Sequence, residues 1–558
     1  MTRWDTTVDF VIVGSGGGGM VAALTAQAAG ASALVLEKQD RIGGSTCMSG
    51  GIAWIPNNPV MRAAGVPDSL EEAMAHLEAV VGDVGPASSI ERRHAFLTAG
   101  PEMVSFLQRL GVRFAYCPGY SDYYSNAEGG HDLGRGIEPV PWDGNVLGHW
   151  LAKLQPGLAQ SLGMAVMTNE ARSLSHYNRS ARAFAVSARV ALRTVAARAR
   201  QQTLLTNGAS LIGQMLEIAL DREIPVWTEA PLEELVVEDG RVVGVRTVHD
   251  GEPVLVRARQ GVLLSAGGFA HNPAMRREYG GDQPNQAKWS IANPGDTGEA
   301  LRAAMRLGAK TDLMDEAWWL PSPRTGRFGA STLDQARQRP RTIYVDANGQ
   351  RFVNESNSYM EVGKAMYARD KTSRAVPCWL IFDDRYRKRY AHLRSRPGRF
   401  PRELLESGRL KQAWTLDDLA RMCSIDEVGL AETVERFNRF AEQGLDPDYG
   451  RGESAYNRAL GDPNHKVHPC LGPIDEAPYY AVQVVPGDIG TCGGLLTDED
   501  ARVLDHDDRP IGGLYAAGNI TATVMGRHYL GPGASIANSM IFGYLAARHA
   551  AGGLRGDA

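Results

Sequence analysis

Residues 9–19 read DFVIVGSGGGG, and this stretch decides the fold. Its first five residues form a short apolar run that is typical of a buried parallel strand. The glycines from Gly14 onward open an Ala-rich stretch that we expect to be helical as far as Gly30. A second apolar run, SALVL at residues 32–36, ends at Glu37. Strand, glycine turn, helix and strand in this order predict a βαβ unit, and therefore an α/β protein with a parallel sheet.

The glycines at the first strand-to-helix turn have the spacing of a dinucleotide-binding motif. Gly14, Gly16 and Gly19 fit the pattern GxGxxG. Glu37 follows Gly14 by 23 residues, close to the spacing of about 20 for an acid that binds ribose. Glycine lets the backbone approach a pyrophosphate, and the N-terminus of the following helix supplies N–H donors. We therefore expect a Rossmann-like dinucleotide-binding domain.

Further glycine pairs indicate which dinucleotide is bound. GGST occupies residues 43–46, just after the acid, and GLYAAGN occupies residues 513–519. Both stretches resemble the FAD motifs of the fumarate reductase/succinate dehydrogenase flavoprotein superfamily. The resemblance implies FAD, and we expect it to be noncovalent because no histidine stands in a context suited to a covalent link. The residues that we expect to contact FAD are Gly14, Ser15, Gly16, Gly18, Gly19, Glu37, Lys38, Gly43, Gly44, Ser45, Thr46, Ala266, Gly267, Gly518, Asn519, Ser535 and Ile536.

Composition excludes several other classes of protein. The chain has 558 residues, 43% of them hydrophobic, which excludes a small disulfide scaffold and argues against disorder. Its 59 lysines and arginines against 64 acidic residues give a net charge of −5, so we expect no nucleic-acid partner. The six cysteines lie far apart and form no CxxC pair. We expect reduced thiols in a cytoplasmic protein, with no metal site.

Three segments bear on membrane contact. Residues 10–36 and 529–547 carry no charge, but the first contains the glycine run and the second contains Pro532. We expect both to be buried in the protein rather than to span a bilayer. Residues 171–216 hold seven arginines and no acidic residue. We expect a solvated basic helix or lid there, and loose contact with an anionic membrane surface is the alternative.

The apolar patterns predict further elements along the chain. Helical periodicity covers residues 69–81, 102–110 and 210–222, and short β-type runs between 232 and 256 predict a meander. The run at 261–268 predicts a strand that returns to the dinucleotide-binding sheet.

The order of these elements predicts two domains. From about residue 281 the pattern changes to helices and Pro-rich loops, with one predicted hairpin that joins residues 342–345 to 351–354. Strands and glycine pairs return near residue 475. We therefore predict an α/β, Rossmann-like FAD-binding domain built from both ends of the chain (1–280 and 475–558). An α+β catalytic domain is inserted between them at 281–474.

Tyrosine-containing motifs narrow the resemblance to one family. The stretches VPGDIGT (485–491) and Tyr529-Leu530-Gly531-Pro532-Gly533 are similar to those of the 3-ketosteroid Δ1-dehydrogenases, and the similarity covers nearly the whole chain. It implies that the Tyr529 hydroxyl and the Gly533 N–H bind the 3-keto oxygen of a steroid. It also implies that Tyr359, in the stretch NESNSY, is a catalytic base assisted by Tyr123. Leu530 departs from the proline that the family has there. The neighbours that remain alternatives to Tyr123 are Tyr116, Tyr120 and Tyr124.

The chemistry of this family explains why such groups are needed. The C2 proton of a 3-ketosteroid becomes acidic only if negative charge on the carbonyl oxygen is stabilised, as a phenol O–H and a backbone N–H can do. A tyrosine with a pKa of about 10 is a poor base at neutral pH. A second tyrosine that donates a hydrogen bond to its phenolate lowers that pKa. The C1 hydrogen leaves as a hydride to flavin N5. We expect an apolar steroid to lie among Trp54, Trp318, Trp319 and Met360.

Other functions stay open at this point. One alternative is a related enzyme that introduces the Δ4 bond into 5α-3-ketosteroids. Such an enzyme needs its catalytic base and its ketone-binding groups arranged around C4 and C5. Fumarate reductases bind dicarboxylates with cations, and Gly490 stands where that family has a histidine, although Arg527 is a candidate cation. A noncatalytic electron carrier has no need for three positioned phenols. The main hypothesis is a 3-ketosteroid Δ1-dehydrogenase that acts in steroid degradation. For such an enzyme the resemblance implies a quinone-type electron acceptor.

Overall fold

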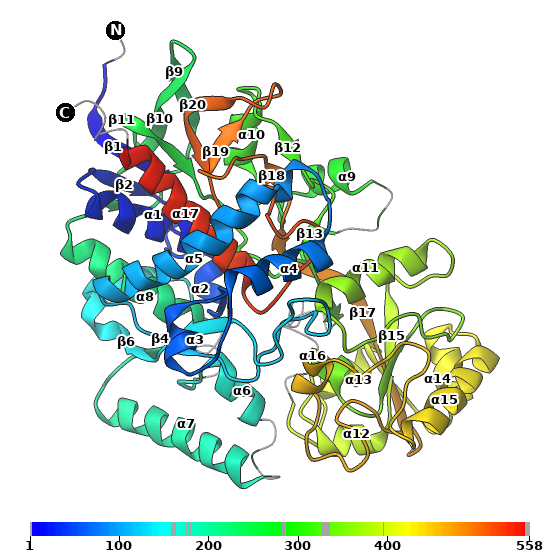
Figure 1. Ribbon diagram of the computed structural model, residues 1–558. Coiled ribbons are helices and arrows are strands. Elements are labelled where there is room, and N and C mark those ends of the chain that lie inside the picture. The colour runs from blue at the N-terminus through cyan, green and yellow to red at the C-terminus, as the bar shows by residue number, and fades with distance from the viewer. Residues whose placement is uncertain are drawn as a thin grey trace.

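The computed structural model puts β1 (Thr6–Val13) inside an eight-stranded sheet (Figure 1). The structure describes residues 3–157, 163–174, 177, 180–281, 283, 286–324, 335–393 and 395–552. The sheet runs β19–β20–β11–β1–β2–β8, and the five strands from β20 to β8 are parallel. The antiparallel pair β10 and β9 extends it from β11. The bounds are β2 (Ala33–Leu36), β8 (Val226–Trp227), β9 (Glu234–Glu238), β10 (Arg241–His249), β11 (Glu252–Leu264), β19 (Arg502–Leu504) and β20 (Pro510–Ala516).

The predicted βαβ unit is confirmed. Helix α1 (Gly17–Ala28) follows β1 at once because Gly14 has φ +109°, a conformation that favours glycine. Gly19 packs directly on this turn, since a Cβ built on it lies 2.0 Å from the Gly14 carbonyl oxygen. Strand β2 pairs with β1 so that Leu36 lies opposite Val13. Glu37 therefore lies at the carboxyl end of the sheet, beside the glycine turn.

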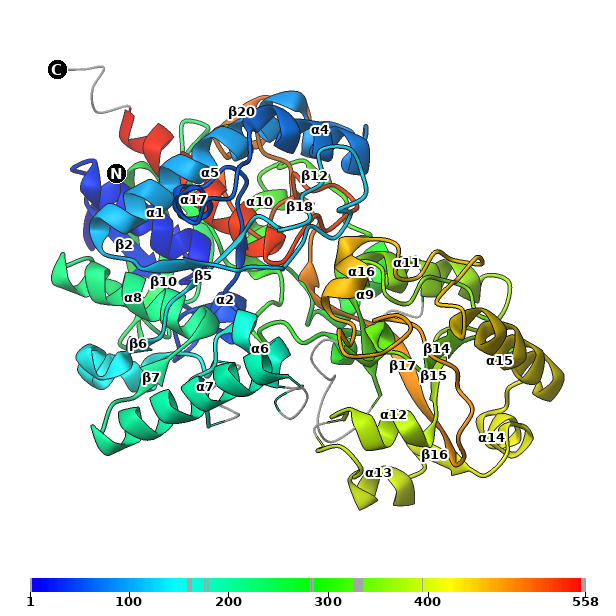
Figure 2. The same cartoon turned by 60° about the horizontal axis from the view of Figure 1, so that its bottom comes forward.

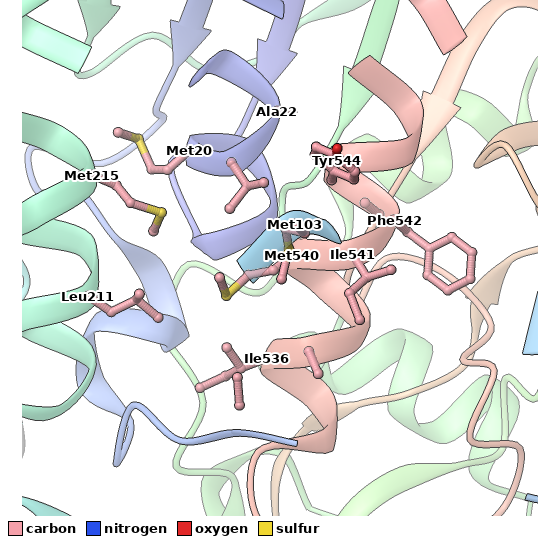
Figure 3. Close-up of a cluster of buried hydrophobic side chains, with 14 of the residues drawn as sticks. Met20, Ala22, Met103, Leu211, Met215, Ile536, Met540, Ile541, Phe542 and Tyr544 are labelled. Atoms are coloured by element: carbon pink, nitrogen blue, oxygen red, sulfur yellow. The ribbon is translucent and has the colours of Figure 1, made fainter. Parts of the chain in front are cut away.

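The two ends of the chain build one core. The C-terminal helix α17 (Ala534–Gly552) packs against α1 and α5 (Ile90–Leu110), and α8 (Asn207–Asp221) packs against α1 from another side. The uncharged run at 529–547 is thus confirmed as largely buried helix, and among the described residues no helix is long and apolar enough to cross a membrane. Figure 3 shows side chains from these helices in one buried cluster, among them Met20, Met103, Leu211, Met215, Ile536 and Met540.

The predicted helices at 69–81 and 210–222 are present as α4 (Leu70–Val81) and α8. Helix α5 differs, because it begins at Ile90 rather than near 102 and runs through Pro101. A proline lacks the N–H of an interior helical residue and usually ends a helix. Here the buried face on both sides of Pro101 keeps the helix packed on α17.

A second sheet forms the core of a second body (Figures 1 and 2). Its strands are β13 (Ala317–Pro323), β14 (Thr342–Val345), β15 (Cys378–Phe382), β16 (Leu410–Ala413) and β17 (Tyr479–Thr491), in the order β13–β17–β15–β14 with β16 on β17. Its helices are α11 (Tyr359–Asp370), α12 (Asp384–Arg389), α13 (Arg402–Glu406), α14 (Leu416–Cys423), α15 (Glu427–Ala441) and α16 (Ala455–Ala459). Since β17 pairs with β13 and β15, residues 479–491 belong to this sheet, although we expected the chain to leave the inserted domain at 474.

The hairpin predicted at 342–354 is wrong. β14 pairs with β15, so that Val345 lies opposite Trp379, and residues 351–354 form no strand. The Asp346 carboxylate accepts hydrogen bonds from the backbone N–H groups of Asn348 and Gln350, both at 2.9 Å, and holds the turn as a side-chain-capped loop. Arg351 then pairs with Glu355 and Asp446 inside the second body instead of continuing a ladder.

Smaller elements complete the chain. Helices are α2 (Gly44–Met48), α3 (Pro59–Ala63), α6 (Thr168–Leu174), α7 (Ala181–Ala199), α9 (Pro273–Gly280) and α10 (Glu299–Met305), with 3₁₀ turns at Pro86–Ser88, Gly144–Lys153, Ala287–Trp289 and Gln335–Gln338. Short strands are β3 (Ala53–Trp54), β4 (Phe114–Tyr116), β5 (Gly136–Pro139), β6 (Trp142–Asp143), β7 (Leu204–Leu205), β12 (Thr311–Asp312) and β18 (Gly494–Leu495). The six cysteines are buried, and none of them forms a disulfide in the described part of the chain.

Candidate active site

A cavity of about 1590 Å³ extends from the β1–α1 turn to the second body. The glycine motif of the eight-stranded sheet lines one end. Arg389 of α12, Tyr456 of α16 and Leu460, just after α16, line the other. Residues of α6 also line it, from the side of the first body. Most of the predicted cofactor residues and the predicted tyrosines therefore meet in one continuous space.

The glycine turn faces this cavity with open backbone. A Cβ built on Gly16 has only the Thr46 Oγ1 within 4 Å, at 3.8 Å, and one built on Gly44 has no neighbour within that distance. Nearby, the Gly17 N–H donates to the Thr46 Oγ1 at 3.1 Å. Open space beside backbone N–H groups at the start of a helix suits a phosphate. The residues present therefore fit the pyrophosphate of a dinucleotide.

Glu37 lines the cavity and also holds the glycine turn. Its Oε2 accepts hydrogen bonds from the Ser15 hydroxyl at 2.5 Å and from the Ser15 N–H at 3.2 Å. The Ser15 hydroxyl oxygen in turn accepts from the Gly43 N–H at 2.9 Å. The acid thus links both glycine motifs, and it lines the cavity beside the glycine turn, as an acid that binds ribose does in this type of motif.

Most predicted FAD residues line the cavity, and three do not. Gly18 packs on Ser539, Gly19 on Gly14, and Gly43 on the Cys47 side chain. Gly18 brings α1 close to α17, and Gly19 and Gly43 pack on the turns at which their helices begin, so these three glycines contact protein atoms instead of lining the cavity. The predicted residues that line the cavity are Gly14, Ser15, Gly16, Glu37, Lys38, Gly44, Ser45, Thr46, Ala266, Gly267, Gly518, Asn519, Ser535 and Ile536.

Asp296 also lines the cavity, and we did not predict it. Burial raises its pKa to about 7, opposed by a hydrogen bond from the Ser45 hydroxyl and by the charge of Lys38. A Cβ on Gly267 lies 2.2 Å from the Asp296 Oδ1, so these two loops are in direct contact. The stretch NPGDTG before α10 could have indicated that Asp296 lies at the site, because it is a second glycine-containing loop that precedes a helix.

The start of α17 forms part of the cavity wall. Ser535 and Ile536 in its first turn line the cavity together with Gly518 and Asn519 after β20. The Trp318 indole N–H donates to the Asn519 Oδ1 at 3.0 Å and fixes that side chain from the second body. This part of the cavity lies at the junction of the two bodies, where the N-terminus of α17 offers N–H groups to a ligand.

The tyrosines predicted from three distant motifs lie in ring contact. The ring centroid of Tyr359 is 5.2 Å from that of Tyr123 and 5.1 Å from that of Tyr529. The Tyr123 and Tyr529 rings are 5.6 Å apart. All three line the cavity, as does Gly533.

The other candidates for the assisting tyrosine are engaged elsewhere. The Tyr116 hydroxyl donates to the Leu133 carbonyl oxygen at 2.6 Å, and the Tyr120 hydroxyl to that of Thr168 at 2.9 Å. The Tyr124 hydroxyl donates to Glu361 at 2.9 Å. This arrangement favours Tyr123 among the four.

The turn from Tyr529 to Gly533 is tightly held. Gly533 has φ +84°, and a Cβ on it lies 1.8 Å from the Ile52 carbonyl oxygen, so only glycine fits there. The Tyr529 hydroxyl lies 3.0 Å from the Ser535 Oγ. A phenol and a backbone N–H are thus fixed on one turn at the cavity wall.

Burial dominates the ionisation of the tyrosines. It raises the pKa of Tyr359 well above the usual value of a tyrosine, and the neighbouring Tyr123 and Tyr529 hydroxyls add to the rise. It also raises the pKa of Tyr123 well above that value, while a hydrogen bond with Tyr359 opposes the rise. A phenolate here needs stabilisation by other groups of the site.

One expectation about neighbouring residues was wrong, and one alternative loses its candidate residue. Trp54, Trp318, Trp319 and Met360 lie buried in the core and do not line the cavity. Trp318 instead supports the Tyr529 ring edge-on, with centroids 5.0 Å apart. Arg527 does not line the cavity either, and it pairs with Asp315 and Glu316 at 2.9 and 2.8 Å. It is therefore no free cation for a dicarboxylate.

Gly16→Val tests the phosphate end of the site. A Cβ at this position meets only the Thr46 Oγ1, at 3.8 Å, and the added side chain takes up cavity space, so we expect a folded protein that is purified with most of its FAD lost. The flavin-to-protein absorbance ratio measures this loss. Gly512→Val, on β20 and outside the cavity, is the control and is expected to keep its FAD. Equal FAD content in both variants would remove Gly16 from the cofactor site.

Comparisons with known proteins agree with this geometry. The model of the FAD binding domain family matches residues 9–536. The 3-oxosteroid 1-dehydrogenase of Mycobacterium tuberculosis is 44% identical over 97% of this chain and 98% of its own. The structure of 3-ketosteroid delta1-dehydrogenase from Sterolibacterium denitrificans, in complex with 1,4-androstadiene-3,17-dione, matches 98% of this chain and 100% of its own with TM-score 0.91 and 37% identity. A 3-ketosteroid-delta4-(5alpha)-dehydrogenase from Rhodococcus jostii covers 99% of this chain and 98% of its own with TM-score 0.67 and 22% identity, which shows the shared fold alone. The chain belongs to the FAD binding domain family, and within it to the family of the 3-oxosteroid 1-dehydrogenases.

Proposed function

We propose that this protein is an FAD-dependent 3-ketosteroid Δ1-dehydrogenase, which converts a 3-keto-4-ene steroid into the 1,4-diene-3-one. One observation carries the proposal. The Tyr529–Gly533 turn offers a phenol and a backbone N–H in the same cavity as the FAD motif. The ring of Tyr529 is in contact with the ring of Tyr359. A ketone bound at the turn brings the carbon next to it toward the base.

The residues divide the reaction between them. Tyr529 and Gly533 donate hydrogen bonds to the 3-keto oxygen and stabilise the negative charge that develops when C2 loses its proton. Tyr359 accepts that proton, and Tyr123 donates a hydrogen bond to the Tyr359 oxygen. FAD, when bound, accepts the C1 hydrogen as a hydride. No charged group is needed to bind the substrate, which fits the pairing of Arg527 with acids.

Turnover of two steroids tests the proposal. Purified protein should convert androst-4-ene-3,17-dione into the 1,4-diene in the presence of an electron-accepting dye, with the product identified by mass spectrometry and NMR. Formation of a Δ4 bond from a 5α-saturated 3-ketosteroid, without any 1,4-diene from the 4-ene, would instead identify the sister activity. Reduction of fumarate by the flavin-reduced protein, without steroid turnover, would contradict both.

A quinone-type compound is the proposed electron acceptor. The support is the family resemblance, and menadione is a suitable probe because its reduction is followed directly by absorbance. Steroid-dependent reduction of menadione is expected under anaerobic conditions. Its absence, with normal turnover by another acceptor, would exclude this class.

The arginine-rich segment supports a second proposal, loose contact with an anionic membrane. Helix α7 projects from the first body in both views (Figures 1 and 2). Phe184, Leu192 and Val195 are spaced to share one face of it and are 63%, 71% and 62% exposed. Arg182 and Arg189 are exposed on the same helix, whereas Arg179 lies outside the described residues. An apolar face flanked by arginines suits the interface of an anionic bilayer.

Vesicle sedimentation tests this contact. We expect the protein to sediment with phosphatidylglycerol vesicles, and the combined change of Phe184, Leu192 and Val195 to serine should abolish this. Trp414→Ser, which removes a residue that is 71% exposed on the second body, is the control and should leave binding unchanged. Equal binding of the wild type and the triple variant would rule out α7 as the contact.

A further inference from the structure

A fourth tyrosine belongs to the cluster. Tyr456, on α16, has its ring centroid 4.3 Å from that of Tyr123, closer than any pair among the three tyrosines described above. It is buried and lines the cavity. No motif pointed to it, because it lies on a five-residue helix in a loop-rich stretch of the second body.

A buried cation lies behind Tyr456. The Arg337 Nη2 is 3.4 Å from the Tyr456 hydroxyl, and the Arg337 side chain is fully buried. Its Nη1 donates to the carbonyl oxygens of Glu355 and Asn357, at 2.5 and 2.6 Å. Those two residues lead into Tyr359, the first residue of α11. Arg337 thus touches both the chain that carries the base and the outer tyrosine of the cluster.

The partners of Arg337 leave its charge available to the cluster. Two other buried arginines are neutralised by acids: Arg135 pairs with Asp68 and Asp122, and Arg276 pairs with Asp488. In the part of the chain that the structure describes, no carboxylate pairs with Arg337, which contacts two carbonyl oxygens and a phenol. A positive charge in a low-dielectric interior favours a nearby anion.

The base needs such a charge. A tyrosine that removes a proton must be ionised, and burial among other phenols disfavours the ionised form. The titratable groups that face Tyr359 are Tyr123, Tyr529 and Tyr456. Farther out, Tyr120 faces Tyr123 and Tyr456. Arg172 in turn faces Tyr120. Burial raises the pKa of Tyr456 as well, but Arg337 opposes that rise through its charge and its hydrogen bond.

We propose that Arg337 is the buried counter-charge of the tyrosine cluster and that, through Tyr456, it favours the ionised form of the base Tyr359. Arg337 and Tyr456 are positioning residues in this account, since neither needs to touch the reacting atoms. The inference rests on the proposed function, because it assumes that Tyr359 removes a steroid C2 proton.

Proton exchange at C2 of the steroid tests the role of Arg337 separately from the hydride transfer to FAD. The FAD-bound protein is first reduced with dithionite, so that no hydride can be accepted, and is then mixed with androst-4-ene-3,17-dione in D₂O. Tyr359 takes the C2 proton, exchanges it with solvent and returns a deuteron, and NMR follows the loss of the C2 proton signal. Because the phenolate is the active form, the exchange rate should rise with pH through the pKa of the base.

Arg337→Gln should shift the pH at which the exchange rate rises upward by about one unit. The exchange rate at neutral pH should therefore fall about tenfold. Tyr456→Phe keeps the ring on Tyr123 but removes the hydroxyl, and it should shift the rise in the same direction. Arg337→Lys keeps a charge and should restore part of the loss. Tyr367→Phe is the matched control on α11, because its buried ring contacts Trp319 rather than the cluster.

The outcomes separate the two claims. Wild-type protein that neither exchanges the C2 proton nor forms the 1,4-diene contradicts the proposed function. If the wild type exchanges the C2 proton, and Tyr456→Phe and folded Arg337→Gln show the same pH dependence as the wild type, the proposed role of Arg337 is contradicted. The proposed function is not affected by that result. If Arg337→Gln fails to fold, as judged by bound flavin and thermal unfolding, Tyr456→Phe by itself decides the question.

Discussion

Replacing Tyr359 by phenylalanine is expected to lower kcat for steroid 1,2-dehydrogenation by about 10³–10⁴, at the upper end of general-base effects. The change removes only the hydroxyl that accepts the C2 proton. The ring still packs against Tyr123 and Tyr529 at 5.2 and 5.1 Å, so the cavity should keep its shape. Binding of FAD and of the steroid should therefore change little. Stopped-flow reduction of the flavin by excess steroid measures the effect.

Tyr367→Phe is also the control for this variant, since it removes a buried hydroxyl from the same helix without touching the cluster. It should reduce flavin at nearly the wild-type rate. A Tyr359→Phe rate within about threefold of the wild type would assign the base to another residue, because a lost general base costs about 10² or more.

Gly533→Ala is expected to lower kcat/KM by about 10²–10³, the effect of losing an oxyanion donor. The new Cβ would lie 1.8 Å from the Ile52 carbonyl oxygen, so the turn must move. That movement displaces both the Gly533 N–H and the neighbouring Tyr529 hydroxyl from the ketone. Steady-state kinetics with androst-4-ene-3,17-dione gives the loss, and part of it should appear as a raised KM.

Gly30→Ala separates the effect of the turn from that of backbone strain. Gly30 has φ +88°, close to the +84° of Gly533, but a Cβ there meets nothing within 4 Å. Both variants carry the left-handed penalty of about 1–2 kcal/mol in stability. Only Gly533→Ala should lose activity. Wild-type kcat/KM in Gly533→Ala would show that this turn does not bind the ketone.

The sequence was most informative where function depends on local geometry. The βαβ unit follows from an apolar run, a glycine turn and an acid within the first 37 residues, and its strands and helix lie where predicted. Gly16 and Glu37 line the cavity for the same reason, since a turn and the end of the next strand fix them. The three tyrosines needed a family resemblance, because residues 123, 359 and 529 meet only through the tertiary fold.

The errors have tertiary causes. Asn348-Gly349 suggested a hairpin, but β14 finds its partner in β15, about 35 residues on, and Asp346 closes the turn without a ladder. The helix predicted at 102–110 begins at Ile90 instead, because packing on α17 carries α5 through Pro101. Arg337 and Tyr456 could not be predicted, because their relevance comes from burial and from contact with a cluster assembled from other segments.

An anaerobic single turnover tests the central claim most directly. Oxidised, FAD-bound protein is mixed with androst-4-ene-3,17-dione that carries deuterium at C1 and C2, and flavin absorbance and product are followed together. We predict one 1,4-diene formed per flavin bleached, with bleaching slowed by deuterium at C1 and at C2. Bleaching without loss of the C1 and C2 hydrogens, or no bleaching by this steroid at all, would contradict the account.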